Sequence, residues 1–328
     1  MKQREFGKTA RSVSEVGFGA WAIGGTWGEV SHADAKQALH AALDAGITFI
    51  DTADVYGDGR SEKIIAEVLR ERGDASPFIA TKAGRRLDPH VASGYNAQNL
   101  NAFVDRSREN LQRETLDLVQ LHCPPTEVYY QPEVFGILDE MVAAGKIRAY
   151  GVSVEKIEEG LKAIEYPNVS SVQIIYNLFR QRPAALFFRE AQKRKVSIIA
   201  RVPLASGLLT GKMRADTAFS ADDHRAFNRN GEAFDKGETF SGVPFEVALE
   251  AVEAIRRYVP GDASMAEFAL RWILMEQAVT VVIPGAKNAQ QAATNARAST
   301  LPPLDDETLA ALRDIYQTQI APWVHQRW

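Results

Sequence analysis

The order of apolar segments along the chain restricts the fold more strongly than any other feature of the sequence. Short apolar runs of four or five residues alternate with longer segments in which apolar residues recur at helical spacing. The eight runs are residues 16–19, 47–50, 78–81, 118–121, 149–152, 171–175, 196–200 and 280–283. This alternation predicts repeated βαβ units, and strands without a polar face indicate a parallel sheet that helices cover on both sides.

Eight strands match a closed (β/α)8 TIM barrel, an α/β fold that commonly needs about 250 residues. The 328-residue chain shows no internal repeat, low-complexity tract or linker, so we expect a single domain over residues 1–328. Ser31 and Ser61 are expected to begin helices, and Gly46 and Gly145 to follow helix ends. An open, doubly wound α/β sheet would show the same alternation and stays open at this point.

A long segment after the seventh predicted strand interrupts the alternation. Residues 204 to about 244 are rich in Gly, Asp, Asn and Arg and contain the spaced phenylalanines Phe219, Phe227, Phe234 and Phe240. A loop of this length in a compact domain is either functional or disordered, and the phenylalanines favour a lid that packs on the barrel. Residues from 304 to about 318 are expected to form a C-terminal helix, followed by a tail over the same rim.

Charge and composition exclude several classes of protein. The formal net charge is −4 and Lys and Arg are scattered, so we expect no binding to nucleic acid or to a membrane surface. The single cysteine, Cys123, cannot form an intramolecular disulfide, which fits a reducing compartment. The N-terminus lacks the apolar core of a signal peptide, and no segment reaches the roughly 18 apolar residues of a membrane span. We expect a cytoplasmic monomer or homo-oligomer whose partner is a small molecule.

Four polar residues follow the first predicted strands. Asp51, Lys82 and His122 each come directly after an apolar run, and Tyr56 lies five residues beyond Asp51 in a turn-forming context. Any one of them alone could be an ordinary polar residue at a strand end. In a barrel, however, the carboxyl ends of the strands share one rim, where the active sites of such barrels are built.

The chemistry of these four side chains is coherent. A neighbouring ammonium favours the ionised form of a phenol, so Lys82 is expected to lower the pKa of Tyr56. Asp51 can supply the counter-charge that holds Lys82 in place. His122 can donate a hydrogen bond to a substrate oxygen and orient it towards Tyr56.

The stretches that contain these residues, DTADVY at 51–56, TK at 81–82 and LHCP at 121–124, resemble the tetrad motifs of the aldo-keto reductase family. The similarity runs from residue 6 to the C-terminal helix and includes residues 16–21, 145–153 and 203–212. It points to the branch that contains bacterial general-stress aldo-keto reductases and potassium-channel β subunits. The resemblance implies hydride transfer between a nicotinamide cofactor and a carbonyl group, with Tyr56 as general acid, Lys82 and Asp51 as the pair that tunes it, and His122 as the substrate-orienting residue.

The cofactor is expected near the C-terminal end of the chain. The G-x-G-x-x-A pattern at residues 17–22 lacks the helix that must follow a dinucleotide fingerprint at once. Residues 283–288 pass from a strand into a helix, where backbone amides and Lys287 suit an anion, although an ordinary connection with a solvated lysine is the alternative. The resemblance places the adenosine phosphate there. Arg225 could reach a 2′-phosphate, which favours NADPH/NADP⁺, while NADH stays possible.

The family resemblance also implies a full set of cofactor contacts. They are Gly19, Ala20, Trp21, Asp51, Ser153, Gln173, Arg201, Pro203, Leu204, Ser206, Gly207, Lys212, Arg225, Gly285, Lys287, Gln291 and Asn295. Arg201 departs from the family pattern, because many members have an aromatic ring under the nicotinamide at this position. A guanidinium plane can also stack.

The substrate is less constrained than the cofactor. Trp21, Trp27, Tyr56, His122 and Trp323 are the expected substrate contacts, in a pocket that suits a hydroxylated aldehyde such as an aldose or an aryl aldehyde. The six histidines and the cysteine show no metal-ligand spacing, so no metal is expected. A carbonyl reductase is the leading interpretation. A sugar or alcohol dehydrogenase that runs in the oxidative direction and a cofactor-sensing regulatory subunit are the alternatives.

Overall fold

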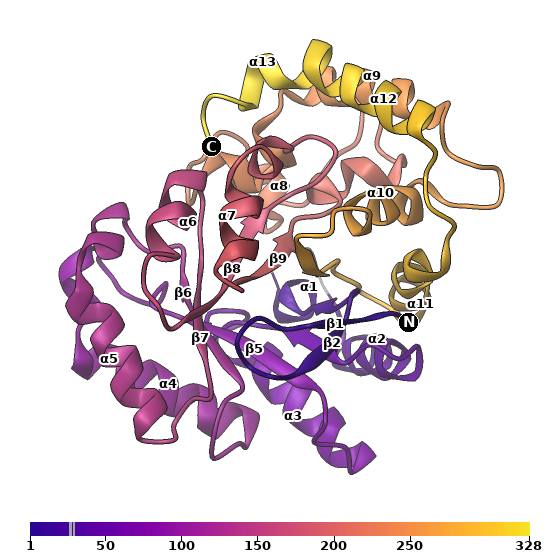
Figure 1. The fold of residues 1–328 in the computed structure, drawn as a ribbon. Helices are drawn as coiled ribbons and strands as arrows, with labels where there is room; N and C mark the ends of the chain where they lie inside the picture. Colours follow the sequence, from indigo (N-terminus) through magenta and orange to yellow (C-terminus); the bar gives the residue numbers. More distant parts are fainter. Residues whose placement is uncertain (26–27, 29) are drawn as a thin grey trace.

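The computed structural model describes residues 1–25, 28 and 30–328. Within them, eight parallel strands form the centre of the molecule and helices surround it (Figure 1). The strands are β3 (Phe18–Gly19), β4 (Phe49–Asp51), β5 (Phe78–Ala83), β6 (Leu118–His122), β7 (Tyr150–Ser153), β8 (Val169–Ile175), β9 (Ser197–Arg201) and β10 (Val279–Val282). Each of them overlaps one of the apolar runs in the sequence, so the predicted strand order is confirmed.

The sheet closes into a barrel through backbone contacts between its first and last strands. The amide of Gly17 donates to the carbonyl of Val282 at 2.8 Å, and the amide of Gly19 donates to the carbonyl of Pro284 at 3.0 Å. The amide of Val282 in turn donates to the carbonyl of Glu15 at 2.9 Å. Since closure removes the sheet edges, the TIM barrel is confirmed and the open doubly wound sheet is excluded.

The helices bury one apolar face against the barrel, as their spacing predicts. They are α1 (Trp21–Gly24), α2 (His32–Asp44), α3 (Arg60–Arg72), α4 (Ala97–Leu111), α5 (Pro132–Ala143), α6 (Ile157–Ala163), α7 (Phe187–Lys193), α8 (His224–Phe227), α9 (Phe245–Arg256), α10 (Met265–Leu274), α11 (Ala289–Arg297), α12 (Asp306–Ile315) and α13 (Ala321–Val324). Ser31 caps α2 by accepting from the amide of Asp34. The helix predicted to begin at Ser61 is confirmed as α3, which begins one residue earlier, but Ser61 does not cap it. Gly59 precedes α3, and the buried Ser61 hydroxyl instead donates to the carbonyl of Ala20 at 3.1 Å.

The barrel interior is apolar at the amino-terminal ends of the strands, here called its lower end; the carboxyl rim is its upper end. Phe49 and Phe78, near the starts of β4 and β5, stack on each other and on Phe6, with ring centroids 4.8 to 5.6 Å apart. Phe6 follows a two-stranded hairpin, β1 (Gln3–Glu5) and β2 (Ser12–Ser14), that the sequence patterns did not indicate. Phe6 therefore lies at the amino-terminal end of the barrel, opposite the carboxyl rim.

The segment after β9, the seventh barrel strand, packs over the carboxyl rim as the lid interpretation predicts. It contains short 3-10 turns at Ala205–Thr210, Lys236–Glu238 and Phe240–Gly242 in addition to α8. Phe240 is buried against Phe245 at a centroid distance of 5.0 Å, and Phe234 meets the edge of Trp21 at 6.2 Å. The lid is therefore ordered by its own aromatic side chains.

The C-terminal segment also reaches this rim. The predicted helix ends at Ile315, and the chain continues through a π-helical turn, Tyr316–Ile320, into α13. The indole nitrogen of the last residue, Trp328, donates to Asp235 of the lid at 2.8 Å, and its ring lies 4.2 Å from the Arg180 guanidinium. The tail thus fastens the lid to the barrel.

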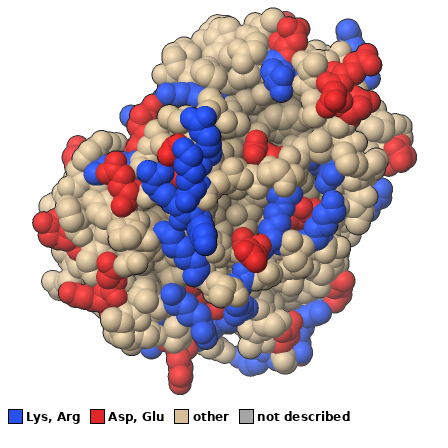
Figure 2. All heavy atoms as spheres, viewed as in Figure 1, with Lys and Arg blue, Asp and Glu red and all other residues tan. Residues whose placement is uncertain are grey.

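The surface carries both signs of charge. Figure 2 shows Lys and Arg in a band where Figure 1 places α7, with acidic side chains around it. At α7, Lys193 and Arg194 both pair with Glu190, at 2.7 and 2.8 Å, so part of this positive charge is neutralised locally. Among the described residues, every helix is too short or too polar to cross a membrane.

Candidate active site

The ends of three neighbouring strands bring the predicted polar residues to one rim. Asp51 and His122 are the last residues of β4 and β6, and Lys82 is the second-last residue of β5. Tyr56 returns over the rim because the chain turns back at Gly57, where φ is +61°. A Cβ at Gly57 would lie 2.1 Å from the carbonyl oxygen of Gly24, so only glycine fits in this turn.

Lys82 is held at the centre of this group by three oxygen atoms. Its ammonium donates to Asp51 at 2.5 Å, to the carbonyl of Thr52 at 2.8 Å and to the Tyr56 hydroxyl at 3.3 Å. Burial alone would lower the pKa of Lys82, but the carboxylate of Asp51 and the phenol of Tyr56 outweigh it and raise that pKa. The second oxygen of Asp51 accepts from Gln173 at 2.7 Å, so the carboxylate is fixed as well.

The phenol of Tyr56 is more reluctant to ionise than we expected from the sequence. Burial raises its pKa, and Asp51 adds to this effect, while Lys82 opposes it without reversing it. The predicted lowering was therefore wrong in net direction, because the protein around the ring outweighs one ammonium. At neutral pH the hydroxyl keeps its proton, and Lys82 is placed to stabilise the phenolate that remains after the proton leaves.

His122 faces the same space as a neutral imidazole. Burial lowers its pKa well below the usual range, and the positive charges of Arg85 and Lys82 lower it further. Its Nδ1 atom is buried and makes no hydrogen bond to any described residue. The ring lies edge-on to Tyr56, with centroids 5.9 Å apart. His122 also lines the cavity beside the phenol, so its ring can meet a ligand oxygen there.

A single cavity of about 1080 Å³ connects this tetrad with the helix α11. Pockets for small ligands commonly measure about 300–1,000 Å³, so this one has room for a large cofactor together with a substrate. The predicted cofactor contacts that line it are Gly19, Trp21, Asp51, Ser153, Gln173, Arg201, Pro203, Leu204, Ser206, Gly207, Lys212, Arg225, Gly285, Lys287, Gln291 and Asn295.

Two predicted contacts among the described residues do not line the cavity, and a third cannot be placed. Ala20 is fully buried and does not line the cavity. Trp323, in α13, has 44% of its surface exposed and does not line the cavity, so the structure gives no support for its predicted contact with substrate. Trp27 lies outside the described residues. Trp21, Tyr56 and His122 do line the cavity.

The end of the cavity far from Tyr56 suits an anionic group. Asn288 caps α11 by accepting from the amide of Gln291, and the positive end of the helix macrodipole faces the cavity there. Lys287 and Arg225 both line this end. Burial lowers the pKa of Lys287, and the nearby Arg225 lowers it further, as expected for two cations that share a site. Arg225 is already paired with Asp223 at 2.5 Å, so a phosphate bound there would meet Lys287 and this paired arginine together.

Arg201 is part of a charge cluster that the sequence patterns did not reveal. Its guanidinium donates to Glu155 at 2.8 Å and lies 3.6 Å from Glu238, which also accepts from Arg85 at 3.0 Å. Burial raises the pKa of Glu155 to about 8. Arg201 lowers this pKa and Glu238 raises it, but burial has the largest effect. Burial would also raise the pKa of Glu238, but Arg85 and Arg201 hold it well below its usual range. Glu155 therefore keeps its proton at neutral pH, and the Glu238 carboxylate lies between the two guanidinium groups on the cavity wall.

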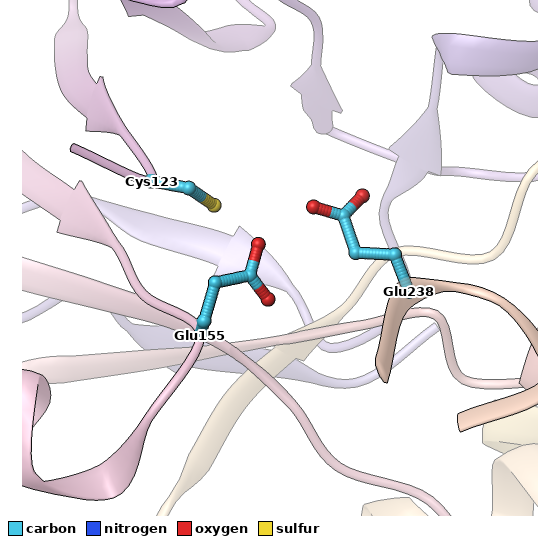
Figure 3. A group of neighbouring side chains, drawn as sticks. All are labelled: Cys123, Glu155 and Glu238. Carbon is cyan, nitrogen blue, oxygen red and sulfur yellow. The ribbon is translucent and has the colours of Figure 1, made fainter. Parts of the chain in front are cut away.

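This cluster also accounts for a group of potential metal ligands. Figure 3 shows the Cys123 thiol and the carboxyl groups of Glu155 and Glu238 pointing towards a common space, and their ligand atoms lie within 4.8 Å of one another. The guanidinium of Arg201 contacts all three, with its Nη2 atom 3.7 Å from the Cys123 sulfur. Because a cationic side chain takes the place of an ion, we propose no metal site there.

The sequence contained a signal for two of the residues that we missed. Arg85 lies three residues beyond Lys82, and Glu155 lies two residues beyond Ser153. Both therefore follow strands whose carboxyl ends were already predicted to lie at the rim. Glu238 lies in the lid, where no strand or helix periodicity indicates the path of the chain. Its position could not have been inferred from spacing.

Comparison with known proteins assigns the chain to a family. The model of the aldo/keto reductase family matches residues 15–317. The aldo-keto reductase YhdN from Bacillus subtilis is 32% identical over 300 residues, which cover 89% of this chain and 86% of the relative. The L-glyceraldehyde 3-phosphate reductase from Escherichia coli O157:H7 is 28% identical and covers 95% of this chain and 91% of its own.

A solved structure extends the comparison to three dimensions. The glycerol dehydrogenase AKR11B4 from Gluconobacter oxydans superimposes with a TM-score of 0.75 and 30% identity, covering 98% of this chain and 96% of its own. The match therefore includes the lid and the C-terminal segment as well as the barrel. The chain belongs to the aldo/keto reductase family.

Proposed function

We propose that the protein is an NADP(H)-dependent oxidoreductase that reduces an aldehyde or ketone to an alcohol, with Tyr56 as the general acid. One observation carries this proposal: the Tyr56 hydroxyl lies 3.3 Å from the Lys82 ammonium, beside His122, at the inner end of a cavity that also reaches α11. A proton donor, its charge partner and a polarising imidazole are the groups that carbonyl reduction requires of a protein.

Each side chain has a separate task in this reaction. When bound, the nicotinamide cofactor supplies the hydride to the carbonyl carbon. The neutral His122 holds the carbonyl oxygen through a hydrogen bond, and the Tyr56 hydroxyl donates its proton to that oxygen. Lys82 stabilises the phenolate left on Tyr56, and Asp51 keeps Lys82 charged and in position. General acid catalysis of this kind contributes about 10²–10⁴-fold in rate.

The residues on the wall fit a phosphorylated dinucleotide. Ser153 and Gln173 lie next to the tetrad on β7 and β8, where they could hold the nicotinamide amide. Lys287 and Arg225 at the far end supply positive charge for a 2′-phosphate, which favours NADP(H) over NAD(H). Arg201 lies between the two ends of this wall and could stack on the nicotinamide with its guanidinium plane.

Whether the protein reduces a carbonyl or oxidises an alcohol depends on the ratio of reduced to oxidised cofactor as well as on the site. The same residues would act in reverse, with Tyr56 accepting the proton of an alcohol, by microscopic reversibility. The solved relative described above as a glycerol dehydrogenase supports an oxidative role as the second candidate. Both candidates predict that activity depends on Tyr56.

The proposal is tested by following oxidation of NADPH and of NADH in the presence of short aldehydes, aldoses and aryl aldehydes. The matched control is Tyr56→Phe, with cofactor affinity measured separately by fluorescence titration. Turnover that is lost in the variant while NADPH still binds supports the proposal. Tight cofactor binding without Tyr56-dependent turnover in either direction contradicts it and favours a cofactor-sensing role.

A further inference from the structure

Two charged residues at the substrate end of the cavity have no task in the proton and hydride chemistry. Arg85, just after β5, and Glu238, in the lid, line the same cavity as Tyr56 and His122. The guanidinium of Arg85 donates to Glu238 at 3.0 Å and lies 3.7 Å from Glu155. A buried ion pair is costly to desolvate and seldom adds net stability, so its presence in a ligand pocket calls for a role in binding.

Arg85 is the member of the charge cluster that is most open to the cavity. Its side chain is 24% exposed, whereas those of Arg201 and Glu238 are 8% and 4% exposed. A guanidinium carries five N–H donors, and Arg85 spends one on its hydrogen bond to Glu238. The remaining donors can meet oxygen atoms of a ligand, next to a carboxylate that can accept.

The cavity wall next to these charges is aromatic. Phe234 lies 5.6 Å below the Arg85 guanidinium and meets Trp21 edge-on, and Trp21 in turn stacks on Tyr56 at 6.0 Å. Such rings offer flat apolar surface to C–H groups, while the ion pair offers a donor and an acceptor side by side. This combination suits a short carbon chain that carries hydroxyl groups on one side.

We infer that Arg85 and Glu238 together determine specificity for hydroxylated carbonyl compounds, by binding hydroxyl groups on the two carbons that follow the reacting carbonyl carbon. The inference rests on the proposed function and adds to it the substrate class and the residues that select it. The Arg85 guanidinium donates to one hydroxyl oxygen, and the Glu238 carboxylate accepts from a neighbouring hydroxyl.

The cluster offers both hydrogen-bond donors and acceptors to a hydroxylated substrate. Both guanidinium groups share the Glu238 carboxylate, and the Glu155 carboxyl group, which keeps its proton at neutral pH, lies beside Arg201. A hydroxyl group can both donate and accept, so it fits this network without leaving a charge unpaired.

The test compares two aldehydes of equal size. In 2-methylbutanal, methyl groups replace both hydroxyls of glyceraldehyde, so the ratio of their kcat/KM values isolates the hydroxyl contacts. In Arg85→Met, in Glu238→Gln and in the double variant, which leaves no lone charge from the pair, we expect kcat/KM for glyceraldehyde to fall about 10- to 100-fold. The value for 2-methylbutanal should stay within about threefold. Arg189→Met, at an exposed arginine of α7, is the matched control and should change neither.

The outcomes separate this inference from the proposed function. Loss of both activities to the same extent in the double variant, with its fold intact by circular dichroism, contradicts a role in specificity. Faster reduction of glyceraldehyde 3-phosphate than of glyceraldehyde by the unmodified protein also contradicts it, because the site would then select an anion. If neither aldehyde shows Tyr56-dependent turnover, the proposed function itself fails.

Discussion

The two ends of the barrel interior are built from the same strands but by opposite means. Phe49 and Asp51 lie two residues apart on β4, and Phe78 and Lys82 lie four apart on β5, so each pair faces the same interior. At the lower end the aromatic rings pack within 4.8 to 5.6 Å of one another. At the upper end, Asp51 and Lys82 meet at 2.5 Å and are just as buried.

This difference shows how one strand can serve stability and chemistry at once. Apolar burial at the lower end is favourable in itself, with each large side chain contributing about 1.5–3 kcal/mol. The charged upper end depends on complete pairing, because removing one partner leaves a buried charge uncompensated. Substitutions at the lower end should therefore affect folding, and substitutions at the upper end should affect catalysis above all.

Lys82→Met is expected to have the largest effect. It removes the cation that stabilises the Tyr56 phenolate, so kcat/KM should fall by at least about 10³-fold. It also leaves Asp51 buried without its ammonium partner, which costs about 3–5 kcal/mol. Steady-state kinetics and urea unfolding measure the two effects. Activity within tenfold of the unmodified protein would show that Lys82 has only a structural role.

Phe49→Ala tests the lower end and sharpens the comparison. Loss of its ring from the stack with Phe6 and Phe78 should cost about 3–5 kcal/mol of unfolding free energy. Because the tetrad lies one layer higher, kcat at 20 °C should change by less than about threefold. A collapse of kcat in variant protein that is still folded would contradict the separation of the two ends.

Asp54 is a buried carboxyl group without a partner among the described residues, and the pH dependence of stability should show its effect. Burial raises the pKa of its carboxyl to about 7, and Glu62 adds to this effect; neither oxygen has a hydrogen-bond partner among the described residues. The folded state thus keeps a proton that the unfolded state loses above about pH 4, so stability falls as the pH rises from about 4 to 7.

Asp54→Asn should remove this loss. The variant should be more stable than the unmodified protein at pH 8, by up to about 4 kcal/mol, and the gain should shrink towards pH 4. Thermal unfolding at pH 5, 6, 7 and 8 measures the trend. An equal difference between the two proteins at every pH would mean that Asp54 does not titrate in this range.

Lys287→Met should have the smallest effect and concerns cofactor choice. If Lys287 contacts a 2′-phosphate, KM for NADPH should rise about tenfold and KM for NADH should change by less than twofold, since one charge-assisted contact contributes about 1.5 kcal/mol. An equal rise for both cofactors would assign Lys287 to the pyrophosphate or to helix structure instead.

The sequence predicted the barrel and the tetrad for the same reason. Parallel strands share one carboxyl end, so Asp51, Lys82 and His122 had to meet once the strand order was correct. The direction of the Tyr56 pKa could not be predicted, because it depends on how much protein surrounds the ring. Glu238 and the final tryptophans were equally inaccessible, because the lid and the π-helical turn before α13 set their positions.

The central claim is that the upper end of the barrel carries out hydride transfer with Tyr56 as the proton donor. A single-turnover measurement tests it most directly: protein saturated with NADPH is mixed with excess glyceraldehyde, and loss of reduced-cofactor absorbance is followed in the unmodified protein and in Tyr56→Phe. We predict a rate at least about 10²-fold lower in the variant, with an unchanged NADPH dissociation constant. Equal rates in the two proteins would show that the phenol does not take part in the reaction and would contradict the mechanism.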